Sequence, residues 1–232
     1  MSMPMPETSA AKPLPTLGRA RAGRLVVALF AVLVAVLATV LWAPPVPPGL
    51  AAPTEGTWDD SLAGRLLVAT EKMGDPRFQK TVIYMIEHSR DGAMGLIVNV
   101  PMGAVPAAKL FKRLGLDGDG VEGEIEVYFG GPVEPDRGFL LHSTDVLLRG
   151  SVLIDERVAL SAHPKLLLAI ARGEGPAQSV FTLGYAGWGP SQLESELARR
   201  DWFVIPADMS LVFAPDPAKS WERAAARRGF DL

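Results

Sequence analysis

The longest apolar run in the chain lies near its N-terminus. Residues 25–43 carry no charge, and Thr39 is their only polar side chain. A helix rises ~1.5 Å per residue, so this run would extend about 28 Å, close to the thickness of the hydrocarbon layer of a bilayer. The pattern predicts one transmembrane helix over residues 25–43.

The charges on the two sides of this run differ in sign. Ahead of it lie Lys12, Arg19, Arg21, Arg24 and one acid, Glu7. Between the run and residue 61 every charged residue is acidic. Because basic segments stay on the cytoplasmic side of a membrane, we expect residues 1–24 in the cytoplasm, a single pass through the inner membrane and an extracytoplasmic C-terminal domain. A cytoplasmic domain is the alternative.

Two other interpretations of residues 25–43 stay open. A cleaved signal peptide would be processed near Ala51 and Ala52, and a buried core helix would need protein on every side. The run exceeds the roughly 7–15 apolar residues usual in a signal peptide. A segment rich in Pro and Ala, residues 44–60, separates it from the rest of the chain. These features favour an uncleaved anchor followed by a semi-extended linker.

From residue 61 onward, short apolar and β-branched runs alternate with glycine-rich breaks. Asp91-Gly92 stands between two such runs and predicts a β-hairpin over residues 81–99, because glycine tolerates positive φ in a tight turn. Other strands are predicted over residues 66–70, 127–129, 138–142, 152–154, 179–185, 202–205 and 211–213.

Helices are predicted over residues 106–114, 163–172, 191–200 and 217–228. Pro106 suits the first turn of the first helix, and Gly115 suits its end. The sequence contains neither long βαβ alternation nor an internal repeat, which disfavours a doubly wound parallel sheet. The prediction is a single compact α+β domain over residues 61–232, with complex and mostly antiparallel topology.

Composition narrows the classes of function. The chain has no cysteine, which excludes disulfides and thiol catalysis. Its histidines, His88, His142 and His163, are not at metal-ligand spacing, so neither a metal nor a cofactor is predicted. The chain has 23 Lys and Arg against 26 Asp and Glu. A mildly acidic chain is not attracted to nucleic acid in general, and no nucleic-acid partner is expected.

Four sequence blocks resemble the YqgE/AlgH family. They are EHSRDGAMGLIVN at 87–99, FGGPV at 129–133 with DRGFLLH at 136–142, LGYAGWG at 183–189 with QLE at 192–194, and PAD at 206–208 with Phe213 and Trp221. The resemblance runs from about residue 62 to the end of the chain. It implies a single α+β domain without established enzymatic activity and a proposed role in regulating alginate production.

The chain departs from this family pattern in two respects. Family members usually begin near the domain and are taken to be cytoplasmic, whereas this chain carries the apparent anchor. The position after Asn99, which is often basic in relatives, is Val100 here. The second departure weakens an anion site at that position.

Two glycine-rich turns are candidates for ligand contacts. Backbone N–H groups around Gly130 and Gly131 could face an anion, although a strand end where only glycine fits is the favoured interpretation. Tyr185, Trp188 and Gln192 lie around the start of the third predicted helix, and helix N-termini attract anions. For Trp188, a core position is the favoured interpretation.

Asp136, Arg137 and His142 lie within one short stretch. A carboxylate, a guanidinium and an imidazole can support acid–base chemistry. The plainer interpretation is that Asp136 and Arg137 pair locally and that His142 is half-buried in a strand. The nucleophile pattern GxSxG is absent from the sequence.

The favoured hypothesis is a non-enzymatic, membrane-tethered binding or regulatory domain for an unknown protein or small molecule, in envelope or exopolysaccharide regulation. The alternative is an enzyme of unrecognised type that uses Asp136, Arg137 and His142. The sequence does not define the oligomeric state.

Overall fold

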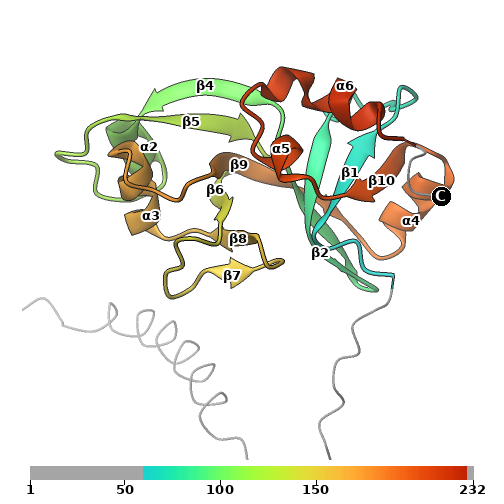
Figure 1. Ribbon diagram of the computed structural model, residues 1–232, viewed down its shortest axis with the longest axis horizontal. Helices are drawn as coiled ribbons and strands as arrows, with labels where there is room; N and C mark the ends of the chain where they lie inside the picture. Colours follow the sequence, from blue (N-terminus) through green and yellow to red (C-terminus); the bar gives the residue numbers. More distant parts are fainter. Residues whose placement is uncertain (1–59, 229–232) are drawn as a thin grey trace, which may run out of the picture. The chain divides into compact units, whose positions relative to one another are not determined.

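The structure, a computed structural model, describes residues 60–228 (Figure 1). The predicted transmembrane run at 25–43 and residues 44–59 of the predicted linker lie outside these residues. Within the described range, no helix has the length and hydrophobicity needed to cross a membrane.

One ten-stranded sheet organises the described residues. Its strands are β1 Arg65–Ala69, β2 Val82–Ser89, β3 Gly92–Ile97, β4 Pro101–Pro106, β5 Glu124–Phe129, β6 Val133–Ser143, β7 Val152–Leu153, β8 Val158–Ser161, β9 Ser179–Trp188 and β10 Trp202–Pro206. The main order is β10-β1-β2-β3-β9-β6-β8-β7, and β5 joins β4 to β9. Within residues 60–228 every strand pair except β5–β9 is antiparallel. This confirms the predicted α+β class and mostly antiparallel topology.

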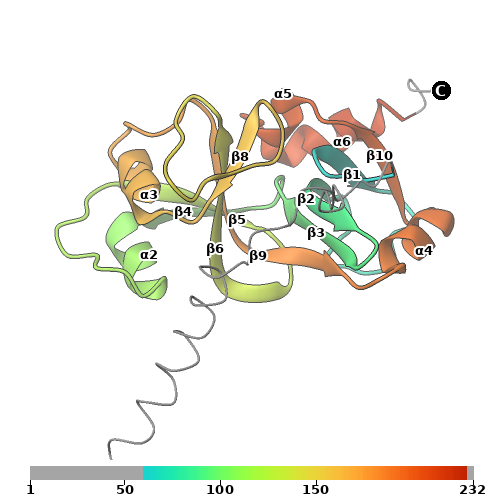
Figure 2. The same cartoon turned by 90° about the horizontal axis from the view of Figure 1, so that it is seen from below.

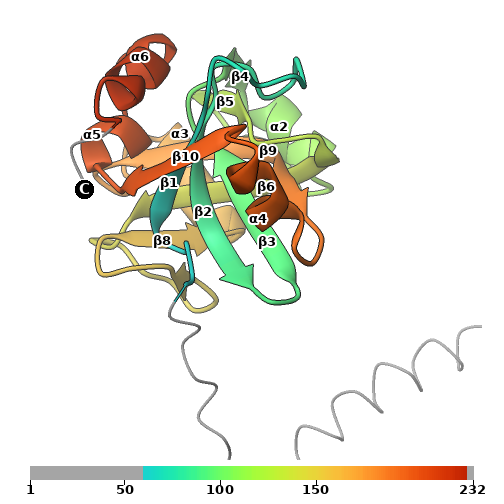
Figure 3. The same ribbon diagram turned by 90° about the vertical axis from the view of Figure 1, so that its right-hand side faces the viewer.

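Helices cover the sheet at both ends of the domain (Figure 2). They are α2 Ala107–Arg113, α3 Pro164–Ala171, α4 Gln192–Ala198, α5 Met209–Val212, the 3-10 helix η1 Pro217–Lys219 and α6 Ser220–Ala225. Helices α2 and α3 lie at one end, and α4 lies at the other. Figure 3 shows α5 and α6 on one side of β1, β2 and β10, with α4 on the opposite side.

The buried side chains form three clusters. Two of them lie on opposite faces of β1, because neighbouring residues of a strand point to opposite faces of the sheet. In β1, Leu66 and Val68 pack toward α5 and α6, whereas Leu67 and Ala69 pack toward Leu193 of α4. The third cluster lies beneath α2 and α3. A strand that is apolar at successive positions, such as β1, is therefore buried on both faces.

Strand β9 joins the two halves of the sheet. Its C-terminal part pairs with β3, through Ala186 to Trp188, and its N-terminal part pairs with β5 and β6. At the change of partner, the Gly130 N–H donates to the Leu183 carbonyl at 2.8 Å. The Gly130 carbonyl accepts a hydrogen bond from the Ile97 N–H of β3 at 3.0 Å. The backbone of Gly130 thus bridges β3 and β9.

This bridge leaves no room for side chains. A Cβ atom on Gly130 would lie 2.2 Å from the Gly184 carbonyl oxygen, and one on Gly131 would lie 2.2 Å from the Tyr185 carbonyl oxygen. A Cβ on Gly184 would lie 2.3 Å from the Gly131 oxygen, and Gly184 has a φ of +72°. The favoured interpretation of Gly130 and Gly131, a place where only glycine fits, agrees with this geometry. We call these three residues the glycine crossing.

Most predicted elements are present, with differences at particular places. The hairpin forms as β2 and β3, with Ser89 paired to Gly92 across the turn. The strand predicted at residues 211–213 is wrong. These residues overlap α5, whose start is capped by Asp208 Oδ1 accepting from the Ser210 N–H at 2.7 Å. Strands β4 and β8 were not predicted.

We predict that Gly131→Ala lowers the free energy of unfolding by at least about 3 kcal/mol, because its Cβ would overlap the backbone of β9. Gly103→Ala is the matched control. Gly103 also has positive φ, +103°, but no atom lies within 4 Å of its Cβ position. It should cost only about 1–2 kcal/mol, the strain of a side chain at positive φ. Urea unfolding of the two variants checks this, and equal losses would contradict the crossing as a close-packed contact.

Candidate binding groove between α2 and α3

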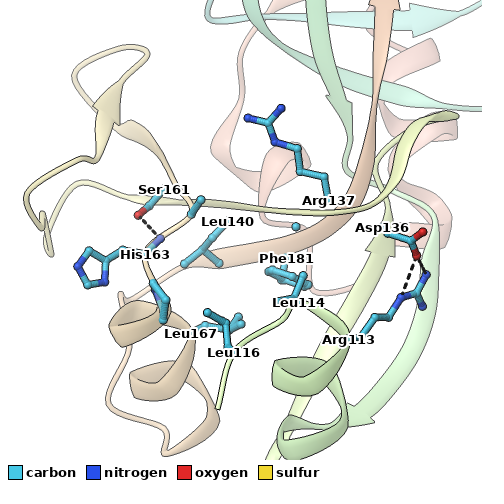
Figure 4. Close-up of a pocket in the computed structure, with 13 residues that line it drawn as sticks. Arg113, Leu114, Leu116, Asp136, Arg137, Leu140, Ser161, His163, Leu167 and Phe181 are labelled. Atoms are coloured by element: carbon cyan, nitrogen blue, oxygen red, sulfur yellow. Dashed lines mark hydrogen bonds and ion pairs between the residues drawn. The ribbon is translucent and has the colours of Figure 1, made fainter. Parts of the chain in front are cut away.

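A cavity of about 260 Å³ opens between α2, α3 and β6 (Figure 4). We call it the α2–α3 groove. Its floor is apolar and comes from the segment after α2 and from β6, α3 and β9, which are distant in sequence. The floor residues are Leu114, Leu116, Leu140, Leu167 and Phe181. Figure 4 shows these side chains converging, so the groove offers a surface for an apolar group.

Two glycines, Gly138 and Gly115, allow the floor side chains to come together. Gly138 lies in β6, where a Cβ atom would be 2.7 Å from the Phe181 ring and 3.1 Å from Leu114 Cδ2. Gly115 has a φ of +72° directly after α2, which turns the chain between Leu114 and Leu116. On the other wall, His163 caps α3, since its Nδ1 accepts from the Lys165 N–H at 3.1 Å.

The polar groups around the groove are paired with one another. Arg113 Nη2 lies 2.8 Å from Asp136 Oδ1, and Arg137 Nη1 lies 2.9 Å from Glu134 Oε2. The predicted local pair between Asp136 and Arg137 is therefore wrong, because each has a different partner. Arg137 also lies over the Phe139 ring at 5.0 Å. These exposed pairs leave the groove without a strong net charge, and each contributes at most about 1 kcal/mol.

His142 is fully buried in β6 rather than half-buried, and it does not line the groove. Its Nδ1 lies 2.9 Å from the Ser143 carbonyl oxygen, and its Nε2 has no hydrogen-bond partner among the described residues. The structure thus brings Asp136 and Arg137 to one rim and places His142 elsewhere. The three side chains do not form a common site.

Ser143 and Asp145 hold the end of β6. The Ser143 hydroxyl donates to Asp145, and the Ala177 N–H donates to Asp145 Oδ2 at 2.9 Å. These hydrogen bonds keep the pKa of Asp145 below its usual value. The Gln178 N–H in turn donates to Ser143 Oγ at 3.0 Å. The serine is therefore engaged in closing a loop.

Trp188 and Gln192 belong to a second place, beside α4. Glu196 Oε2 accepts from the Trp188 indole at 2.9 Å and from the Trp202 indole at 2.7 Å. Its Oε1 accepts from Gln192 Nε2 at 2.9 Å. Trp188 and Trp202 are both buried. Trp188 is therefore a core position, as the favoured interpretation had it, and Glu196 is a structural residue that the sequence did not reveal.

Tyr185 points to the opposite face of β9 and makes an edge-to-face contact with Phe139, with ring centres 5.8 Å apart. It lines an open cavity of about 400 Å³ with Trp188, while Trp188, Gln192 and Glu196 line another of about 580 Å³. The candidate residues thus do not form one site: Asp136 and Arg137 line the α2–α3 groove, whereas Trp188 lines both of the other cavities. Among residues 60–228, no three His, Cys, Asp or Glu side chains are grouped to hold a metal ion.

The floor of the α2–α3 groove was missed by sequence reasoning. Its only sequence signal is the Leu-Gly-Leu at residues 114–116, where a glycine at the end of a helix separates two apolar residues. The other floor residues read as ordinary core positions of a strand or helix.

The chain is similar to proteins of one known family. A model of the family described as AlgH-like matches residues 66–232. A UPF0301 protein of Methylococcus capsulatus is 46% identical over 178 residues, which are 77% of this chain and 96% of that protein. A UPF0301 protein of Afipia carboxidovorans is 45% identical over 179 residues, 74% of this chain and 85% of that protein.

Two solved structures share the fold. The solution structure of the AlgH protein from Pseudomonas aeruginosa has a TM-score of 0.62 at 38% identity, covering 78% of this chain and 92% of that one. The crystal structure of DIP2367 from Corynebacterium diphtheriae has a TM-score of 0.57 at 24% identity, covering 72% of this chain and 87% of that one. The second shows likeness of fold alone.

Glu196→Ala should lower the free energy of unfolding by about 2–4 kcal/mol, because it leaves two buried indole N–H groups without their acceptor. The near-UV circular dichroism of the tryptophans should change with it. Glu222→Ala, an exposed glutamate on α6, is the control and should change stability by less than about 0.5 kcal/mol. Similar stability in the two variants would show that Glu196 does not secure the tryptophans.

Proposed function

The chain belongs to the AlgH-like family, and we propose that its folded domain is a non-enzymatic binding module whose ligand site is the α2–α3 groove. The observation that carries this proposal is the apolar floor of the groove, open between two helices and bordered by polar groups that are already paired. A ligand with an apolar group, either a protein side chain or a small molecule, matches that surface.

Binding, rather than catalysis, is favoured by the chemistry of the rim. Arg113 and Asp136 are engaged with each other, and Arg137 is engaged with Glu134. Ser161 Oγ accepts from the His163 N–H at 3.1 Å, which fixes the start of α3. None of these groups forms a nucleophile–base pair within the described residues. The enzyme alternative needed Asp136, Arg137 and His142 together, and no observation favours it.

We propose further that residues 25–43 hold this module at the inner membrane, with the domain on the extracytoplasmic side and a role in envelope or exopolysaccharide regulation. The uncharged run, with cations before it and acids after it, supports the anchor. Alkaline extraction of membranes tests the anchor, since an integral segment keeps the chain in the pellet and a soluble chain is released.

A photoreactive benzoylphenylalanine in place of Ala162, an exposed residue lining the groove, should form an ultraviolet-dependent adduct in membranes from the source cells. The same substitution at Ala218, exposed on η1, is the control and should form none. Gel shift and mass spectrometry of the purified chain detect protein and small-molecule adducts alike.

A second substitution ties the adduct to the groove. Leu116→Asp places a charge on the apolar floor and should reduce the adduct at position 162 at least tenfold. Equal adducts at positions 162 and 218, or an adduct indifferent to Leu116→Asp, would show that the groove is not the ligand site.

A further inference from the structure

Four large apolar side chains are exposed among residues 60–228. They are Met102 at 57%, Leu147 at 48%, Val152 at 58% and Leu153 at 58%. Three of the four lie within residues 145–153, which we call the β7 loop. Clustering of this kind on a domain surface marks a contact with another surface more often than isolated exposed residues do.

The β7 loop has a defined conformation. The Ser151 N–H donates to the Leu148 carbonyl at 2.9 Å, and the Leu148 N–H donates to Ser151 Oγ at 3.3 Å. Gly150, with a φ of +94°, turns the chain between them. Val146 and Leu148 pack against the core cluster beneath α2 and α3. The exposed apolar residues are thus held on a turn that is anchored to the domain.

The charges of this region favour contact with a lipid surface. Arg149 is exposed at the tip of the turn, between Leu147 and Val152. Two of the nearby acids have internal partners, since Asp145 accepts from Ser143 and Ala177, and Asp155 accepts from the Tyr84 hydroxyl at 2.9 Å. A third, Glu156, is exposed, and the exposed Arg157 follows it directly. Apolar side chains beside a cation suit the boundary between headgroups and acyl chains, where the cation reaches the phosphates.

The chain enters the folded domain next to His88 at the end of β2, on the same side of the domain as this loop. Gly64 lies against Asp155, two residues after β7, with a Cβ position 3.7 Å from Asp155 Cβ. Figures 1 and 3 show the first described residues, in cyan, on the same lower side of the domain as β7 and β8, whereas β4 lies at the top. Residues 44–60 can span at most about 60 Å. An anchor at residues 25–43 would therefore keep the β7 loop near the bilayer at high effective concentration.

We propose that Leu147, Val152 and Leu153 insert into the headgroup region of the bilayer that holds residues 25–43, with Arg149 at the lipid phosphates. This inference rests on the proposed membrane anchor. It gives the domain a second, shallow membrane contact, which orients the β7 side toward the lipid and the β4 side away from it.

The absence of cysteine allows clean single-site labelling. The full chain, carrying Leu153→Cys or Met102→Cys and an NBD fluorophore, is reconstituted into phosphatidylethanolamine–phosphatidylglycerol vesicles with nitroxide-labelled lipid. These two positions are equally exposed, and one lies on β7 whereas the other lies on β4. We expect quenching by the nitroxide to be at least twofold stronger at position 153, with a blue-shifted emission.

A further variant tests the apolar insertion itself. Adding Leu147→Asp and Val152→Asp should reduce the quenching at position 153 to the level at position 102. Equal quenching at the two positions overturns the inference. A blue shift at position 153 without quenching by lipid also overturns it, and shows that a second copy of the chain covers the loop.

Alkaline extraction distinguishes a failure of the proposed anchor from a failure of the proposed β7-loop contact. A chain that stays in the pellet but shows equal quenching keeps its anchor and lacks the second contact. A chain that is released by alkaline extraction lacks the anchor, and the inference fails with it.

Discussion

The domain depends on a place where three stretches of backbone come together without side chains. Gly130 bridges β3 and β9 with hydrogen bonds on both sides, and Gly131 and Gly184 pack backbone to backbone across the crossing. Since β9 is the strand that connects the two halves of the sheet, side chains at these positions would force the halves apart. The α2–α3 groove lies in one of these halves and α4 lies in the other.

Many residues of the sequence blocks that resemble the AlgH-like family have structural roles of this kind. The Gly-Gly of one block and the Leu-Gly-Tyr of another meet at the crossing. Trp188, from the latter block, donates its indole N–H to Glu196. His88, from the first block, lies 3.0 Å from Glu194 through its Nε2 and accepts from the Leu62 N–H. These residues hold the domain together, whereas the block at 136–142 also supplies Asp136, Gly138 and Leu140 to the groove that we propose as the ligand site.

The sequence predicted the elements whose ends are set by neighbouring residues, such as turns and helix termini. The β2–β3 hairpin was predictable because Asp91-Gly92 suits a tight turn, and α3 because Gly173 follows its last turn. Residues 211–213 were misjudged because three successive apolar residues suit a strand or a short helix equally. The helix is stabilised by the Asp208 cap and by the packing of Leu211 and Val212 against β1.

The candidate site could not be predicted because its contacts are distant in sequence. Asp136 pairs with Arg113, 23 residues away, rather than with its neighbour. Leu114, Leu140 and Phe181 meet in the groove only after β6 and β9 have paired. His142 and Asp136 lie in one strand, yet one side chain is buried and the other is exposed. Closeness in sequence therefore gave a false grouping.

Hydrogen exchange at two amides tests the glycine crossing most directly. The Ile97 N–H donates to the Gly130 carbonyl, and the Gly130 N–H donates to the Leu183 carbonyl. If the crossing holds the two halves of the sheet together, both amides exchange only through global unfolding, with the free energy measured by denaturant. Rapid exchange of both amides through local opening, while the β1–β2 amides stay protected, would contradict the account and show Gly130-Gly131 to be a free turn.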